Sequence, residues 1–413
     1  MSWKFTATET RVPAQGMVSA SSGEETLSIM LTDWRAMGIW EKDFAFPGTD
    51  GCHLAVDSDA VAELGNKVGV MACFHTADGT MQHMDYLEPV LRADGQLSFA
   101  RDFKREPGIT GVTLKLYAKW AEGVVRFRNI RVEAAAAPAE RIARVVTTMV
   151  QPTWNNETTP ERMKRVESLL QKIAKEVEKP DLVLFSEAIP DLCMGLPLSK
   201  GAEPVPGPNT ELFAGWARKL NCYIVFGIHE IEQGNYYNTA VILDRQGNIA
   251  GKYHKVHLTW NESESGVIPG DSFPVFQLDF GCVGIATCWD NWFGESARHL
   301  RLNGAELMLV PIAGCGIPEH RDHVWAARAG ENGMAAAFAV SIPSEDKIAA
   351  SRIYDPIGRI LAETTQDNSY AWADINLTKR LRTRYLSVSC YGEGRSLYVR
   401  ERRNGVYQRM NQA

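Results

Sequence analysis

The spacing of apolar residues divides the chain into two parts of different character. Up to about residue 133, short segments in which apolar and polar residues alternate are separated by Gly, Asp and Ser. In GVTLKLYAKW, Val112, Leu114 and Leu116 fall on one face while the residues between them are polar, as a half-buried antiparallel strand requires. The pattern predicts an all-β unit, and a sandwich fits it best.

From residue 141 onward, apolar strands alternate with amphipathic helices. The preceding segment EAAAAPAE offers a core nothing large to bury and is typical of a linker. In TTPERMKRVESLLQKIAKEVEK, apolar residues recur at helical spacing and Pro160 suits the first helical turn. Strands such as DLVLFSE and YIVFGIHE follow, so this part is predicted to be α/β.

These changes predict three segments: a β-sandwich domain over 1–137, an α/β domain over 141–376 and a C-terminal arm over 377–413. The last 38 residues hold nine Lys or Arg and two Glu. A basic stretch of this kind is typical of an arm that faces solvent or a partner.

Composition excludes several classes of protein. The 413 residues are 45% apolar and 23% charged, without an apolar run long enough to span a bilayer, so we expect no membrane segment. A formal charge of −6 lacks the basic field that nucleic-acid binding requires. The polar start MSWKFTATETRVPAQ lacks the apolar core of a secretory signal, so we expect a cytoplasmic protein.

The cysteines and histidines predict neither a disulfide framework nor a metal site. Eight cysteines are spread through the chain without a CxxC pair. His320 and His323 in EHRDH have a spacing that allows metal ligation, but no HExxH motif or cysteine ligand accompanies them. We therefore expect no metal.

Three polar residues stand where predicted strands finish. Glu187 ends DLVLFSE, Lys255 lies in GKYHKVHL, and Cys288 ends CVGIATC. Taken singly, the glutamate is typical of a helix cap, the lysine of a solvated surface charge and the cysteine of a buried core residue. Together they have a chemical rationale, because a nucleophilic thiol needs a carboxylate to take its proton. A lysine ammonium and the backbone N–H after the cysteine would stabilise the oxyanion formed at a carbonyl.

Two other interpretations remain open at this stage. His229, His254 and His257 offer a papain-like Cys–His pair with Cys288, although papain-like wording around the cysteine is absent. Alternatively, the protein is a non-catalytic binding or scaffold module that captures a carbohydrate or polymer with its β domain.

The sequences of three separated motifs resemble those of one enzyme superfamily. FSEA, YHKVHL and TCWDNWFGESARHLRLNGAELMLVP occur in this order and resemble the carbon-nitrogen hydrolase (nitrilase) superfamily over roughly residues 142–376. The resemblance implies an αββα sandwich that works without a cofactor. It also implies Glu187 as general base, Lys255 as oxyanion stabiliser, Cys288 as the nucleophile that forms a thioester, and the backbone N–H of Trp289 as a further donor.

The same resemblance extends to a second glutamate and to both ends of the chain. NESESGVIPGD offers Glu262 and Glu264, and the wording NES, found in ureido-cleaving relatives, favours Glu262 without excluding Glu264. The final segment resembles C-terminal arms that cross a subunit interface, which implies a homo-oligomer, a dimer or larger. The N-terminal domain is similar to jelly-roll carbohydrate-binding modules.

The substrate is expected to be a small carboxamide or N-carbamoyl (ureido) compound, cleaved with release of ammonia or amine. Trp260, Trp289 and Trp292 flank the predicted site and suit a substrate pocket, where Asp290 would orient a polar group. The sequence Cys-Trp-Asp is close to the Cys-Trp-Glu of nitrilases, so nitrile hydrolysis is the alternative.

Overall fold

The computed structural model describes residues 2–21, 24–153, 156–314, 318–342, 350–385, 390–403 and 406–407. It divides the chain into two compact units. One unit is Met1–Ala139 together with Arg380–Ala413, and the other is Glu140–Lys379. The end of the chain thus belongs to the same unit as its beginning.

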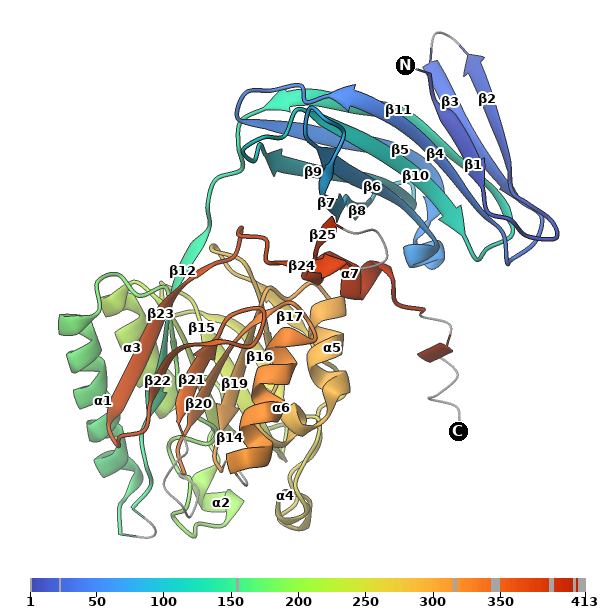
Figure 1. Cartoon of the computed structure of the whole chain (residues 1–413). Helices are drawn as coiled ribbons and strands as arrows, with labels where there is room; N and C mark the ends of the chain where they lie inside the picture. Colours follow the sequence, from blue (N-terminus) through green and yellow to red (C-terminus); the bar gives the residue numbers. More distant parts are fainter. Residues whose placement is uncertain are drawn as a thin grey trace. The chain divides into compact units, whose positions relative to one another are not determined.

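The first unit is built from two antiparallel-rich sheets (Figure 1). The seven-stranded sheet has the order β1 (Lys4–Ala7), β4 (Met37–Ala45), β10 (Gly111–Lys119), β6 (Val68–His75), β7 (Met81–Tyr86), β25 (Cys390–Glu393) and β24 (Arg382–Tyr385). The six-stranded sheet has the order β2 (Gln15–Ser21), β3 (Glu24–Leu31), β11 (Gly123–Ala135), β5 (Gly51–Val61), β9 (Gln96–Lys104) and β8 (Glu88–Leu91).

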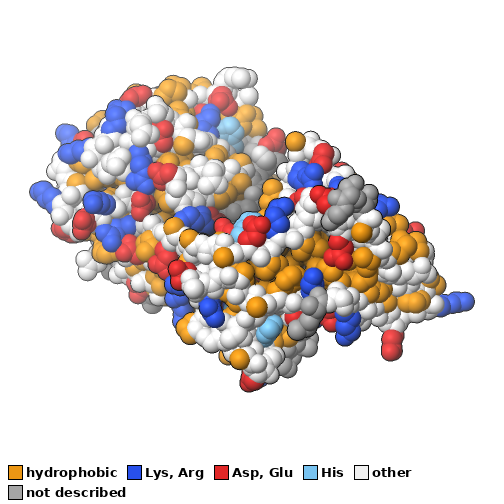
Figure 2. All heavy atoms as spheres, turned by 90° about the horizontal axis from the view of Figure 1, so that it is seen from above, with side chains coloured by type: hydrophobic (Ala, Val, Ile, Leu, Met, Phe, Trp, Pro, Cys, Tyr) orange, Lys and Arg blue, Asp and Glu red, His pale blue; other side chains and the backbone are white. Residues whose placement is uncertain are grey.

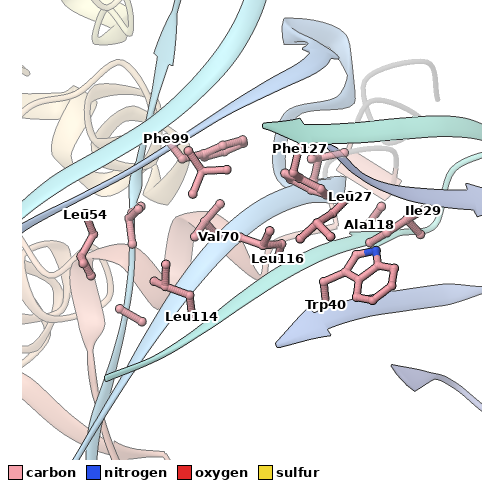
Figure 3. Packing of buried hydrophobic residues seen from close by; sticks show 14 of the residues in the cluster. Leu27, Ile29, Trp40, Leu54, Val70, Phe99, Leu114, Leu116, Ala118 and Phe127 are labelled. Carbon is pink, nitrogen blue, oxygen red and sulfur yellow. The ribbon is translucent and has the colours of Figure 1, made fainter. Parts of the chain in front are cut away.

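The core of this unit lies between the two sheets. Leu114 and Leu116 of β10 belong to one apolar cluster with Leu27 and Phe127 of the opposite sheet, and all four are fully buried (Figure 3). Val112 is buried in the same way. The alternation predicted from GVTLKLYAKW is therefore confirmed, as is the β sandwich.

The C-terminal segment extends the seven-stranded sheet. β25 pairs with β7 in parallel, with Tyr391 opposite His83, and pairs with β24 in an antiparallel hairpin. Helix α7 (Gly394–Arg400) follows, and its Leu397 packs in an apolar cluster with Met84 and Tyr86. The sequence predicts a separate C-terminal arm, whereas the described residues of this segment belong to the N-terminal unit. Its role at a subunit interface stays a prediction.

Buried charges tie this segment to the sandwich. Arg382 donates to Asp85 at 3.0 Å and also pairs with Glu106. Burial alone would raise the pKa of Asp85, but the His83 ring 3.4 Å away and the charges of Arg101 and Arg382 hold that pKa well below its usual range. Asp85 is therefore a buried, ionised carboxylate that joins the C-terminal segment to the sandwich.

We predict that Asp85→Ala lowers the free energy of unfolding of the first unit by about 2–3 kcal/mol, because Arg382 loses a hydrogen-bonded pair with a fully buried carboxylate and Arg101 loses one of its nearby negative charges. Urea unfolding of the full chain, followed separately for each unit, measures this change. The control is Asp94→Ala, which removes an exposed pair with Arg92 and should cost about 0.5 kcal/mol or less. Equal effects of the two substitutions would contradict the assignment.

The second unit contains two six-stranded sheets. The first has the order β16 (Ile249–His254), β15 (Asn235–Leu243), β14 (Tyr223–Glu232), β13 (Leu182–Leu184), β12 (Ile142–Met149) and β23 (Ser369–Asn376). The second has the order β17 (Val275–Gln277), β18 (Cys282–Ile285), β19 (Leu307–Ile312), β20 (Ala335–Val340), β21 (Ser351–Tyr354) and β22 (Ile360–Thr364).

Helices cover the outer faces of these sheets (Figure 1). Helices α1 (Thr159–Glu176) and α3 (Pro208–Leu220) pack on the first sheet, and α5 (Gly294–Leu302) and α6 (Pro318–Gly330) pack on the second. A further apolar cluster lies between the sheets. The remaining helices, α2 (Leu198–Gly201) and α4 (Trp260–Glu264), are short. The predicted αββα sandwich is confirmed.

Among the described residues, no helix is long and apolar enough to cross a membrane. On the face shown in Figure 2, Lys and Arg side chains are dispersed among Asp and Glu. This distribution agrees with the near balance of 44 basic and 50 acidic residues in the chain.

Candidate active site

Glu187 is held rigidly just beyond strand β13. It is 3% exposed, and its Oε2 accepts a hydrogen bond of 2.8 Å from the backbone N–H of Ala313, which follows β19. Gly227 lies against its backbone so closely that an added Cβ would stand 2.5 Å from the Cα of Glu187. A glycine is required there because any side chain would displace the glutamate.

Lys255 follows strand β16 and joins two glutamates. Its Nζ donates to Glu187 Oε1 at 2.7 Å and to Glu262 at 2.9 and 2.8 Å, and the residue is 1% exposed. The amide of Asn238 donates to the same two carboxylates, at 2.7 Å each. Burial alone would lower the pKa of Lys255, but the charges of Glu187 and Glu262 and the hydrogen bond to Glu187 raise it above its usual value. The lysine is therefore a fixed cation.

Glu262 stays ionised in the same group. Burial would raise its pKa, but the charge of Lys255 and hydrogen bonds from Lys255, Thr259 and Asn238 bring the pKa below its usual value. The carboxylate also caps the N-terminus of α4, where its Oε2 accepts from the Thr259 backbone at 2.7 Å. Glu264 is on the same helix and is exposed.

Cys288 opens a tight turn beyond strand β18. Its φ is +46°, a left-handed conformation that costs a residue with a side chain about 1–2 kcal/mol. Burial raises the pKa of the thiol, and the charge of Glu187 and hydrogen bonding to it raise the pKa further, although Lys255 acts in the opposite direction. The resting nucleophile is thus a neutral thiol beside a carboxylate.

Asp290 holds the backbone of this turn in place through hydrogen bonds to its carboxylate. It is fully buried, and its oxygens accept from the backbone N–H groups of Thr287 and His257, at 2.9 and 2.7 Å, and from the Tyr253 hydroxyl at 2.6 Å. The His257 ring lies 2.9 Å from the same carboxylate. Sequence analysis gave Asp290 a substrate contact, but the structure buries it as a link between the cysteine turn and the strand end that carries Lys255.

Arg328 secures the far end of the same turn. From α6 it donates to the backbone carbonyls of Asn291 at 2.8 Å and Trp292 at 3.1 Å. Sequence reasoning missed this contact, and it also missed Asn238. A signal for Asn238 was present, because it alternates with Ala240 and Ile242 and thus falls on an otherwise apolar face.

Two of the predicted aromatic residues, Trp289 and Trp292, lie in this turn, and the third, Trp260, lies on α4. Trp289 is 40% exposed, and its ring centroid lies 6.1 Å from that of Trp292 and 6.0 Å from that of Phe293. Trp260, on α4, is 77% exposed. These rings can receive an apolar group, and their contact with substrate stays a prediction.

The three histidines of the papain-like alternative have carboxylate neighbours. His229 pairs with Asp191, His254 with Glu230 and His257 with Asp290. Within the described ranges no hydrogen bond joins any of them to Cys288. The papain-like arrangement is therefore not formed.

The described part of the chain offers one group of possible metal ligands. Atoms of Glu230, Glu232 and His254 lie within 4.8 Å of one another. The ammonium of Lys252 already donates to both glutamates, at 2.6 and 2.8 Å, and supplies a cation there. His323 is exposed on α6, and the side chain of His320 lies outside the described residues.

Comparison with known proteins assigns the family. The carbon-nitrogen hydrolase profile matches residues 146–385, more than half of the chain. The chain belongs to the carbon-nitrogen hydrolase family. This hydrolase is 29% identical over 236 residues to a probable nitrilase of Schizosaccharomyces pombe, covering 54% of this chain and 86% of that one. It is 30% identical over 197 residues to the omega-amidase of Homo sapiens, covering 43% and 70%.

A solved structure supports the fold of the hydrolase. An amidase of Nesterenkonia, with acrylamide added at its active-site cysteine, superposes with a TM-score of 0.52 at 19% identity, covering 65% of this chain and 99% of that one. The match in fold agrees with the αββα layers described above. The family match and the relatives named amidases support a hydrolase, so the alternative of a non-catalytic binding protein is wrong.

We predict that Asp290→Asn lowers kcat for hydrolysis about 10- to 100-fold and leaves KM nearly unchanged, because an amide cannot accept from all the donors that hold the turn. Steady-state ammonia release measures both constants, and thermal unfolding shows whether the fold is kept. Asp271→Asn, in an exposed loop, is the matched control. A rise in KM with kcat unchanged would point to substrate contact instead.

Proposed function

We propose that the hydrolase cleaves a non-peptide C–N bond of a small carboxamide or N-carbamoyl compound through a thioester on Cys288. The observation that carries this proposal is the buried contact of 2.7 Å between Lys255 and Glu187, formed beside the neutral thiol. Of the two substrate types, the carboxamide has more support, because relatives in the comparison are named amidases.

The first half of the reaction forms the thioester. As Sγ of Cys288 bonds to the carbonyl carbon, its proton passes to Glu187 and the carbonyl π electrons move to oxygen. Lys255 and the backbone N–H of Trp289 stabilise the oxyanion. When the intermediate collapses, the C–N bond breaks and protonated Glu187 gives its proton to the nitrogen, which leaves as ammonia or an amine.

The second half consumes one water. Glu187 takes a proton from the water while the water oxygen bonds to the thioester carbon. Collapse of the second oxyanion then breaks the C–S bond. The sulfur recovers the proton and the acid leaves. Glu262 serves as the second glutamate in this proposal rather than Glu264, because it contacts Lys255 through both oxygens.

Nitrile hydrolysis is the second candidate. The sequence Cys288-Trp289-Asp290 and the relative named as a probable nitrilase favour it. The same thiol would add to the nitrile carbon. The homo-oligomer and the cytoplasmic location remain predictions from the sequence.

We predict that Glu187→Gln lowers the pKa of Cys288, because it removes a negative charge that raises this pKa and leaves Lys255, which lowers it. The ultraviolet absorbance of the thiolate should then appear at lower pH than in the wild type, after subtraction of a matched variant without Cys288. Amide hydrolysis should fall about 10²–10⁴-fold with the loss of the base. Retained hydrolysis would remove Glu187 from the mechanism.

We predict that Cys288→Ala abolishes ammonia release from a panel of aliphatic amides, aryl amides, N-carbamoyl amino acids and nitriles. Wild-type protein with a slow substrate should show an acyl adduct on Cys288 by intact-protein mass spectrometry. Cys282→Ala, a partly buried cysteine on β18, is the control and should keep both adduct and activity. The best substrate of the panel decides between amide, ureide and nitrile.

A further inference from the structure

His229 stands on the same side of its sheet as the Glu187–Lys255 pair, and the mechanism above does not use it. It follows Gly227 by two residues in β14, so both face the same way. Gly227 is the residue against which the backbone of Glu187 packs. The cross-strand partner of His229 is Asn238, whose amide holds Glu187 and Glu262. Two neighbours thus place the imidazole beside the site.

Asp191 orients this imidazole. The Nδ1 atom of His229 lies 2.7 Å from Oδ2 of Asp191, a buried residue in the turn that follows Glu187. A carboxylate at Nδ1 fixes the proton there and directs Nε2 to the other side of the ring. The side chain of His229 is 20% exposed, and within the described part of the chain no hydrogen bond reaches Nε2.

The ring acts as a donor at both nitrogens when it is protonated. Burial alone lowers the pKa of His229, but the hydrogen bond with Asp191 and the charges of Asp191, Glu187 and Glu262 outweigh it and raise the pKa above its usual value. Lys255, the other charged group here, is bonded to Glu187 and Glu262. The carboxylate of Asp191 at 2.7 Å and the nearby Glu187 and Glu262 favour the protonated ring, in which Nε2 carries an N–H and donates.

The charged side chains described around this point sum to a negative charge. Three carboxylates, Asp191, Glu187 and Glu262, surround the ammonium of Lys255 and the imidazole of His229, so the sum is negative whether or not the imidazole is protonated. A substrate carboxylate beside them would add a like charge where solvent screens poorly, whereas an uncharged carbonyl or hydroxyl oxygen would not.

We propose that His229 determines specificity by donating from Nε2 to an uncharged acceptor oxygen on the acyl chain of the substrate. The substrate class is thus neutral amides that carry a second acceptor, in preference to amides that carry a carboxylate. This inference rests on the proposed function and names the substrate class of the same site.

Three amides of similar length test the inference. Succinamide carries a neutral acceptor, succinamate a carboxylate, and pentanamide no acceptor. From ammonia release, kcat/KM for succinamide, halved for its two equivalent ends, should exceed that of each other amide at least about tenfold in the wild type.

Variants of His229 separate substrate contact from support of the fold. His229→Leu should bring succinamide and pentanamide to within about twofold of each other, chiefly through KM, because the donor is gone. His229→Gln keeps an N–H donor and should retain part of the preference. His299→Leu, an exposed histidine on α5, is the matched control and should leave the ratios unchanged.

Each outcome has one interpretation. A wild-type preference for succinamate would overturn the assignment of a neutral substrate. If both His229 variants lower kcat for all three amides by one factor with the ratios intact, His229 supports Glu187 and contacts no substrate. If the wild type hydrolyses none of the three amides, this inference fails, and only inactivity on the whole earlier panel, N-carbamoyl amino acids included, makes the proposed function fail with it.

Discussion

The active site depends on keeping one ammonium charged where water is nearly excluded. Transfer of a lone ammonium from water to such a place costs several kcal/mol, so Lys255 needs compensating carboxylates. Glu187 and Glu262 provide them, and Asn238 holds both. Each partner would be costly to bury without the others. The geometry around the cysteine is consequently part of the stability of the fold.

A second constraint acts on the nucleophile itself. Cys288 has a left-handed backbone, which persists only when its surroundings enforce it. Asp290 fixes the start of the turn through Thr287 and joins it to the strand end at His257, while Arg328 fixes its other end. The same carboxylate therefore connects the segments that carry the thiol and the ammonium.

Much of this arrangement could be predicted from local sequence motifs. Glu187 and Cys288 each follow a strand whose apolar run is visible in the sequence, and Lys255 follows the strand and turn in GKYHKVHL. Side chains at strand ends of the two facing sheets can meet in one site. The functions of Asp290 and Asn238 could not be predicted in this way. They depend on which donors the folded chain places around a carboxylate or an amide, and polar residues in turns and strands have many possible partners.

The C-terminal segment escaped prediction for a related reason. Its pairing with β7 joins residues more than 300 positions apart through a register of two residue pairs, so no local pattern reveals it. The pairing has a consequence for biosynthesis. Because a chain emerges from the ribosome from its N-terminus, the sandwich waits for its last strands until the whole hydrolase unit has been synthesised. An interrupted translation product would therefore expose the open edge of β7 however well its catalytic unit had folded.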